Sequence, residues 1–106
     1  MKKLTAVVLG TLLLAGCGGD AGKEYLGKWQ RVNFKNQTVQ IDRNGDNFIF
    51  RETSPSMLNG EMRTQNLAAV LKDGAMQVSG QMTISLVIDK STGHLTGPNA
   101  DYVKVD

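Results

Sequence analysis

Hydrophobic and polar positions alternate along much of the chain after residue 24, with a period closer to two than to 3.6. In the clearest stretch, 81–89 (QMTISLVID), every second residue is apolar: Met82, Ile84, Leu86 and Ile88. A strand with one buried side requires this alternation, because successive side chains point to opposite faces. Shorter stretches of the same kind begin at Thr38 and at Phe48. The pattern therefore predicts strands for the body of the chain.

Turn signals separate these strand-like segments. They are Asn44-Gly45, Asn59-Gly60, Asp73-Gly74 and the segment 90–94 (KSTGH). Asn, Asp and Gly tolerate the positive backbone dihedrals of tight hairpins. Turns at this spacing predict an all-β fold, a small antiparallel meander of about six to eight strands curled into a barrel or sandwich. The segment 66–72 (NLAAVLK) alone is equally compatible with one or two turns of helix.

The interior of this meander is predicted from the apolar positions of the strands. We expect a shared core of Trp29, Val39, Ile41, Phe48, Phe50, Met82, Ile84, Leu86 and Ile88, with Trp29 as its aromatic anchor. Met62 and Met76 are also expected to fill the core, because a flexible thioether side chain suits irregular gaps.

The first residues differ from the rest of the chain. Met1, Lys2 and Lys3 form a cationic start, and 4–15 is a mostly apolar run without charge. This arrangement is typical of an export signal. A membrane-spanning helix needs roughly 20 apolar residues, and glycines interrupt this run earlier. We therefore expect a cleaved helical signal peptide.

The end of this segment, Leu14-Ala15-Gly16-Cys17, resembles the lipobox of bacterial lipoproteins. The resemblance implies a signal peptide over 1–16, cleavage before Cys17, and lipidation of the Cys17 thiol. Two or three acyl chains anchor a protein far more firmly than one. Residues 17–23 would then be the lipidated cysteine with a flexible tether, and 24–106 a single β domain. The alternative is an ordinary signal peptide with an incidental free thiol.

Gly18 follows Cys17, where an Asp would indicate retention at the inner membrane in the Gram-negative family. The resemblance thus implies an outer-membrane location with the domain facing the periplasm, or the cell surface if the source is Gram-positive. Both envelope types stay open.

Charge argues against nucleic acid as a partner. Of the twelve Lys and Arg residues, Lys2 and Lys3 lie in the signal segment, which leaves ten against ten acidic residues. The remaining basic residues are scattered singly. A nucleic-acid binder needs a clustered cationic face, so we expect none.

Candidate catalytic and metal-binding residues are few. The single histidine, His94, lies in a predicted turn, where a solvated side chain is the ordinary role. Asp42, Asn44 and Asp46 place oxygen donors at alternate positions, but the glycine and closing glutamate of a calcium loop do not follow, so a hairpin is favoured. We expect no enzyme activity, no metal and no cofactor.

Gly27-Lys28-Trp29 is similar to the opening motif of lipocalins and lipocalin-like domains, in which the indole packs across the bottom of a β-barrel. That resemblance implies a carrier of a small apolar ligand. A barrel this small is also expected to fill its interior with side chains.

Met57 and Leu58 follow Pro55, which cannot lie in a central strand. They are candidate contact residues on an edge or loop tip. The alternative is that they fold back over the barrel mouth.

The sequence favours a lipid-anchored envelope lipoprotein acting as a non-enzymatic binding or structural module for another envelope protein; a lipocalin-like carrier is the alternative. Oligomeric state is left open.

Overall fold

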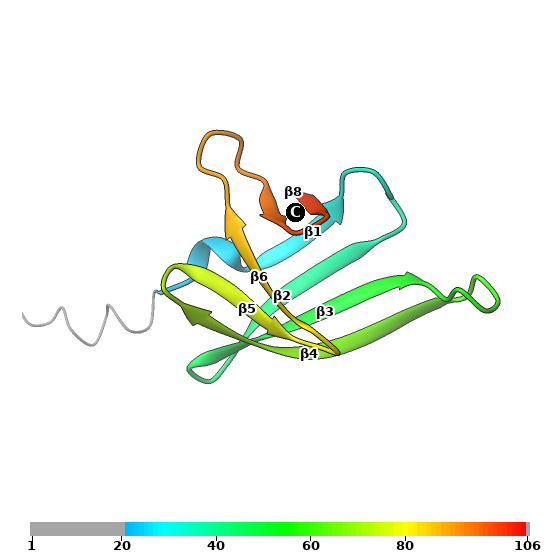
Figure 1. Ribbon diagram of the computed structural model, residues 1–106, viewed down its shortest axis with the longest axis horizontal. Coiled ribbons are helices and arrows are strands. Elements are labelled where there is room, and N and C mark those ends of the chain that lie inside the picture. Colours follow the sequence, from blue (N-terminus) through cyan, green and yellow to red (C-terminus); the bar gives the residue numbers. More distant parts are fainter. Residues whose placement is uncertain (1–20, 106) are drawn as a thin grey trace, which may run out of the picture.

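A computed structural model describes residues 21–105 as one closed antiparallel barrel in which each strand pairs with the next and β8 returns to β1 (Figure 1). Its elements are η2 (Lys23–Tyr25), β1 (Gly27–Arg31), β2 (Thr38–Asn44), β3 (Asn47–Pro55), β4 (Met62–Lys72), β5 (Ala75–Ser79), β6 (Thr83–Ile88), β7 (Leu95–Gly97) and β8 (Ala100–Lys104). The predicted all-β meander is confirmed, at eight strands. Closure removes most of the free strand edge that an open sheet would expose.

The predicted turns are largely confirmed. Asp73 and Gly74 both have positive φ angles between β4 and β5, as a type I′ hairpin turn requires. The β2–β3 turn lies one residue later than expected, because Asn44 pairs with Asn47 and Gly45 alone takes the positive φ. The helical alternative for 66–72 is wrong, since β4 runs through the whole segment.

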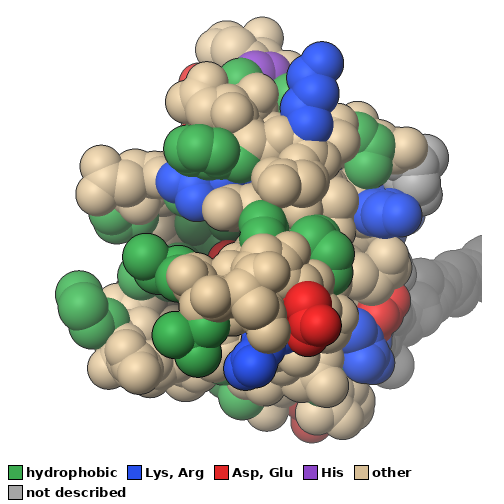
Figure 2. All heavy atoms as spheres, turned by 90° about the vertical axis from the view of Figure 1, so that its right-hand side faces the viewer, with side chains coloured by type: hydrophobic (Ala, Val, Ile, Leu, Met, Phe, Trp, Pro, Cys, Tyr) green, Lys and Arg blue, Asp and Glu red, His purple; other side chains and the backbone are tan. Residues whose placement is uncertain are grey.

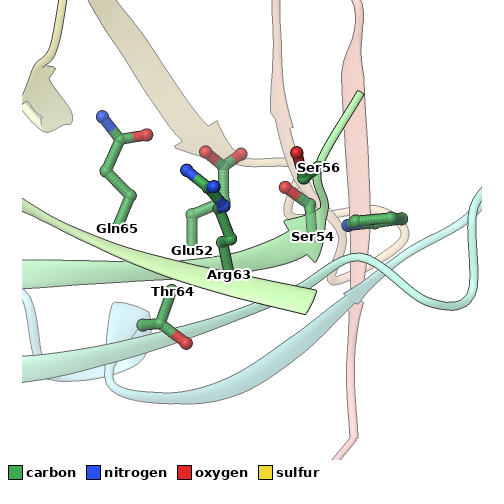
Figure 3. Close-up of a pocket in the computed structure, with 7 residues that line it drawn as sticks. Glu52, Ser54, Ser56, Arg63, Thr64 and Gln65 are labelled. Atoms are coloured by element: carbon green, nitrogen blue, oxygen red, sulfur yellow. The ribbon is translucent and has the colours of Figure 1, made fainter. Parts of the chain in front are cut away.

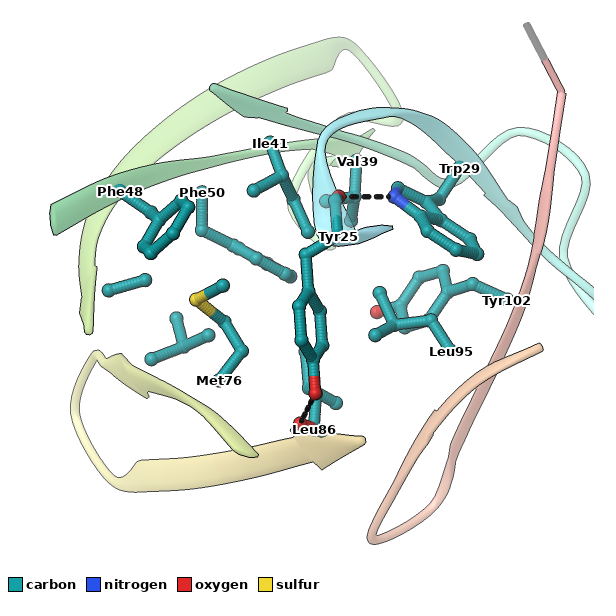
Figure 4. Packing of buried hydrophobic residues seen from close by; sticks show 12 residues of the cluster. Tyr25, Trp29, Val39, Ile41, Phe48, Phe50, Met76, Leu86, Leu95 and Tyr102 are labelled. Carbon is teal, nitrogen blue, oxygen red and sulfur yellow. Dashed lines mark hydrogen bonds between the residues drawn. The ribbon is translucent and has the colours of Figure 1, made fainter. Parts of the chain in front are cut away.

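Twelve hydrophobic residues form the buried core: Tyr25, Trp29, Val39, Ile41, Phe48, Phe50, Ala69, Met76, Val78, Leu86, Leu95 and Tyr102 (Figure 4). Every one of the eight strands contributes to this set. Ile84 and Ile88, predicted as core, are partly buried and pack against it. Burial of such side chains contributes roughly 1.5–3 kcal/mol each, so the core accounts for much of the stability.

Two methionines predicted as core residues are exposed. Met82 follows the alternation of its strand, but β6 begins at Thr83, which pairs with Ser79. Met82 therefore lies in the β5–β6 loop, one residue before the strand begins, and its side chain is outside the barrel interior. Met62 is the first residue of β4 and is exposed because it lies on the opposite face of that strand from the core-facing Leu67 and Ala69. Met76 is fully buried, as predicted.

The segment before β1 closes one end of the barrel. Tyr25 inserts its ring into the core, and its hydroxyl donates to the Gly74 carbonyl at 2.9 Å. The Trp29 Nε1–H donates to the Tyr25 carbonyl at 2.9 Å. Lys104 lies 5.3 Å from the Trp29 ring centroid, and its Nζ donates to the Leu26 carbonyl at 2.6 Å. These contacts join the first described residues to the last strand.

Residues 21–23, the described part of the expected tether, also pack on the barrel. Arg43 donates to the Ala21 carbonyl at 2.8 Å. Gly22 is buried, and Lys23 begins η2. Among the described residues, contacts with the barrel therefore extend to Ala21, ahead of the domain boundary expected at residue 24.

A substitution at Gly22 tests this packing. Its φ is +80°, and a Cβ there would lie 2.6 Å from the Phe48 ring. We expect Gly22→Ala to lower the free energy of unfolding by about 2–4 kcal/mol, from left-handed strain plus overpacking. Gly60→Ala is the matched control, because its φ is +75° with nothing within 4 Å of the added Cβ. It should cost about 1–2 kcal/mol from strain alone. Urea unfolding measures both, and equal costs would contradict the packing.

Candidate binding surface at the loop end

The meander topology divides the barrel connections between two ends. We call loop end the end that carries the β1–β2, β3–β4, β5–β6 and β7–β8 connections. The N-terminal end carries η2 and the other three connections. Figure 1 shows residues 21–25 entering on the left, opposite the β3–β4 connection at the far right. A chain attached through its N-terminus therefore presents the loop end on the far side.

Exposed apolar side chains gather at the loop end (Figure 2). Of nine large hydrophobic residues exposed within 21–105, six belong to this end: Val32, Phe34, Met57, Leu58, Met62 and Met82. The three most exposed are Met57 at 100%, Leu58 at 89% and Met82 at 76%. Scattered single apolar residues are ordinary on a surface, but a concentration at one end indicates a contact site.

The β3–β4 hairpin extends beyond its neighbours. β3 pairs with β2 only as far as Thr53, and β4 pairs with β5 only from Ala68 onward. Residues 54–63 therefore form a two-stranded projection, and 64–67 of β4 have no partner on the β5 side. We call residues 54–67 the hairpin arm. Its tip carries Met57 and Leu58, and the bond from the Ser56 N–H to the Glu61 carbonyl (2.8 Å) closes it.

The inner face of this hairpin changes from apolar to polar where it leaves the barrel. The pairs Phe48↔Ala69 and Phe50↔Leu67 face the core. The next pairs on the same face are Glu52↔Gln65 and Ser54↔Arg63. They line an open hollow of about 420 Å³, and Figure 3 shows these side chains on one side of the hairpin with Thr64 on the other. One carboxylate, one guanidinium, an amide and hydroxyls suit binding of a polar ligand group by hydrogen bonds.

Tyr102 is buried in the core. Burial is the main cause that raises the pKa of its hydroxyl above the ordinary value of 10.0. The Glu52 carboxylate raises this pKa further, and Arg31 lowers it.

The His94 Nδ1–H donates a hydrogen bond to the Asp101 carboxylate, with Nδ1 2.8 Å from Oδ1. This pair joins the start of β7 to β8. Ser91, the serine nearest to His94 in the sequence, donates instead to Asp89 at 2.7 Å. That hydrogen bond also lowers the pKa of Asp89. Within the described part of the chain, no serine, histidine and aspartate are joined as a catalytic triad requires.

The oxygen donors near the β2–β3 turn do not converge on one point. Asp42 pairs with Arg51 at 3.3 Å, while Asn44 ends β2 and Asp46 lies in the turn. Among residues 21–105, no group of three His, Cys, Asp or Glu side chains could hold a metal ion. In the same range, no helix has the length and apolar content to cross a membrane.

A second hollow, about 470 Å³, lies at the N-terminal end between Tyr25, Gly74 and Ile88. Glu24, Val87 and Lys90 complete its lining. It opens beside the closing segment, and the Tyr25 ring separates it from the core.

The residues singled out by the sequence are widely separated. Cys17 lies outside the described residues. Trp29 is 1% exposed and belongs to the closed N-terminal end, whereas Met57 and Leu58 extend into solvent at the opposite end. The alternative in which they fold over the barrel mouth is wrong, given their exposure. Phe34 and Met82 were not predicted as surface residues, because nothing in the sequence distinguishes an isolated apolar residue in a loop from one in the core.

Comparison with known proteins leaves this barrel without a family. No protein-family model matches the chain, and neither the curated proteins nor the solved structures include a match. The described residues define the class of protein by its fold, a small eight-stranded antiparallel barrel.

The raised pKa values of Tyr102 and Tyr25 predict alkaline destabilisation. Their stabilising contribution is complete below pH 10, the ordinary tyrosine value, and is lost as the pH rises through the folded-state pKa. Tyr102→Phe keeps the ring and removes one titrating group. We expect a smaller loss of stability between about pH 9 and 11 in this variant than in the wild type. Thermal unfolding across this pH range measures it, and superimposable profiles would contradict the assignment.

Proposed function

We propose that this chain is a lipid-anchored lipoprotein of the cell envelope whose barrel binds or supports another envelope protein without catalysing a reaction. Cys17 carries the lipid in this proposal. Met57 and Leu58, at the tip of the hairpin arm, are the central contact residues. The observation that carries the proposal is the position of the exposed apolar residues at the end opposite residues 21–25.

The distance between anchor and barrel supports this arrangement. Three residues lie between Cys17 and Ala21, and a fully extended chain spans the distance between these two residues in roughly 14 Å. Because Ala21 contacts the barrel, the N-terminal end would be held near the membrane. Confinement near a membrane raises the effective concentration of a partner there, so a small contact surface is sufficient.

The location follows from the same residues. Gly18 after Cys17 favours the outer membrane, with the barrel in the periplasm; in a Gram-positive cell the barrel would lie at the surface. In either case, the loop end is the part accessible to a partner on the side away from the anchor.

A lipocalin-like carrier is the second candidate. The closed eight-stranded barrel and Gly27-Lys28-Trp29 favour it, because barrels of this strand number can hold one small ligand. The twelve buried side chains argue against it, since they occupy the interior between Trp29 and Phe48. A surface contact therefore has more support than an enclosed ligand.

The contact residues can be tested by capture in cells. We expect the double variant Met57→Ser, Leu58→Ser to lose most of the partner that the tagged wild type captures after cross-linking, by about tenfold or more. Both side chains lie in solvent, so the substitutions should leave the thermal midpoint nearly unchanged. Mass spectrometry of the captured material identifies and quantifies the partner.

The matched control is Val87→Ser with Val105→Ser. These residues are exposed at 44% and 45% and lie outside the loop end, so their replacement removes apolar surface elsewhere. Capture should persist with this control. Undiminished capture by the Met57 and Leu58 variant would refute the proposed contact.

The anchor has its own test. Cys17→Ser removes the only thiol in the chain. We expect the wild-type chain to sediment with membranes and the Cys17→Ser chain to appear mainly in the soluble fraction, because each buried methylene contributes about 0.8 kcal/mol to anchoring. Fractionation with quantitative immunoblotting measures this. Equal membrane association of both chains would contradict lipidation at Cys17.

A further inference from the structure

The hairpin arm leaves one strand edge of the sheet without a partner. Residues 62–67 of β4 pair with β3 on one side, and β5 pairs with β4 only from Ala68 onward. Within residues 21–105, no other strand lies along this edge. Such an edge presents free backbone donors and acceptors to an incoming strand.

The direction of these backbone groups follows from the arm itself. In antiparallel strands, the N–H and C=O groups of successive residues point to alternate sides. The Glu61 carbonyl accepts a bond from Ser56, so it points toward β3. Counted from Glu61, the backbone groups of Met62, Thr64 and Asn66 point to the free edge. All three residues are exposed.

The two edges of the arm are protected differently. On the β3 edge only Ser54 and Pro55 extend beyond the pairing with β2, and Pro55 has no N–H to offer. The β4 edge is longer and contains neither proline nor lysine. Its one charged side chain, Arg63, lies on the inner face beside the polar hollow. Only the β4 edge is therefore suited to pair with another strand.

We infer that this edge pairs with the same edge of a second copy of the chain, antiparallel and about a two-fold axis at Thr64. With Thr64 opposite Thr64, Met62 faces Asn66 of the other copy, and all the outward backbone groups are bonded. An axis at Gln65 would place Met62 opposite Ala68, whose outward groups already pair with Ser79 of β5. Thr64 is thus the centre that pairs all the free groups.

This register also brings exposed apolar residues together. Beyond Met62, the arm of the second copy ends in its tip, and it reaches the end of β5, where the β5–β6 loop carries Met82. Met57 and Leu58 of one copy would therefore lie beside Met82 of the other. These are the three most exposed large hydrophobic residues within 21–105. Together, these side chains of the two copies would form a larger apolar surface than either copy has alone.

Charges are compatible with the pairing. In the register centred on Thr64, Arg63 faces Gln65 of the other copy, which is itself opposite Glu52 across β3 and β4. The ion pairs in the described range are Asp42–Arg51 and His94–Asp101, so Glu52 and Arg63 have no ion-pair partner there. The dimer would place each Arg63 in one cross-strand row with the Glu52 of the second copy, and no like charges would face each other directly.

A cysteine on the two-fold axis tests the register. In the full chain with Cys17→Ser, Thr64→Cys would introduce the only thiol. Facing residues in a hydrogen-bonded antiparallel pair have Cα atoms about 5.5 Å apart, within the range of disulfides. Under mild oxidation, we expect most of the Thr64→Cys chain to migrate as a disulfide-linked dimer on non-reducing gels.

Thr53→Cys is the matched control. The Thr53 and Thr64 hydroxyls bond each other at 2.8 Å, so either substitution removes the same contact. In the proposed dimer the two copies of Thr53 lie three strand spacings apart, about 14 Å, so no disulfide should form. Cross-linking of Thr53→Cys as readily as Thr64→Cys, or of neither, would overturn the proposal.

Thr64→Pro gives an independent measurement without a thiol. The Thr64 N–H points to the free edge, so its removal leaves the pairing of β3 with β4 intact. Light scattering should give twice the chain mass for the Cys17→Ser protein and the single mass after Thr64→Pro is added, with the β-sheet circular dichroism spectrum retained. The thermal midpoint should fall modestly, because the dimer and the Thr53–Thr64 hydroxyl bond are both lost. A dimer that persists in Thr64→Pro, or a Thr64→Cys chain that cross-links only to a different protein in cells, would also overturn it. Thr64→Pro keeps Met57 and Leu58, so capture of another envelope protein by this variant tests the proposed function apart from the dimer.

Discussion

The hydrogen bond from the Trp29 indole to the Tyr25 carbonyl is the contact around which the N-terminal end is built. It fixes the turn between η2 and β1, and this turn directs the Tyr25 ring into the core. Lys104 lies over the same indole, and its Nζ donates to the Leu26 carbonyl. The pairing of β1 with β8 and the closure of the barrel end therefore depend on the same residues. A barrel whose β7 has only three residues needs such support, because its ladder is short at that point.

Because side chains fill the interior of the barrel, the candidate binding residues are those on its surface. The chain contains a single cysteine, so no internal disulfide can hold the barrel together, and stability must come from packing and hydrogen bonds. The inward residues are therefore large, with Trp29 and Phe48 among the largest fully buried side chains. The same requirement leaves little interior space for a ligand. The proposed binding surface lies at the loop end, where apolar packing ends at Phe50 and polar residues begin with Glu52.

The fold was more predictable from the sequence than the candidate site. Alternation and turn residues identified the meander because both are local signals, as Asp73-Gly74 illustrates. Tyr25 was missed as a core residue because it precedes the first strand and has no periodic neighbours. The exposure of Met82 was missed because its position depends on where β6 pairs with β5. The arm depends likewise on where β2 and β5 stop, which only long-range register decides.

The arm combines a fixed position with an open edge. Its strands continue the register set inside the barrel by Phe50 and Leu67, so it leaves the barrel in a defined direction. The Thr53–Thr64 hydroxyl contact ties its strands together at the base. Because the barrel already orders this hairpin, pairing along β4 would require less loss of conformational freedom than the ordering of a flexible loop. A preformed, unprotected edge beside an apolar tip is therefore better explained by association than by the needs of the barrel, whose own strands are all paired without it.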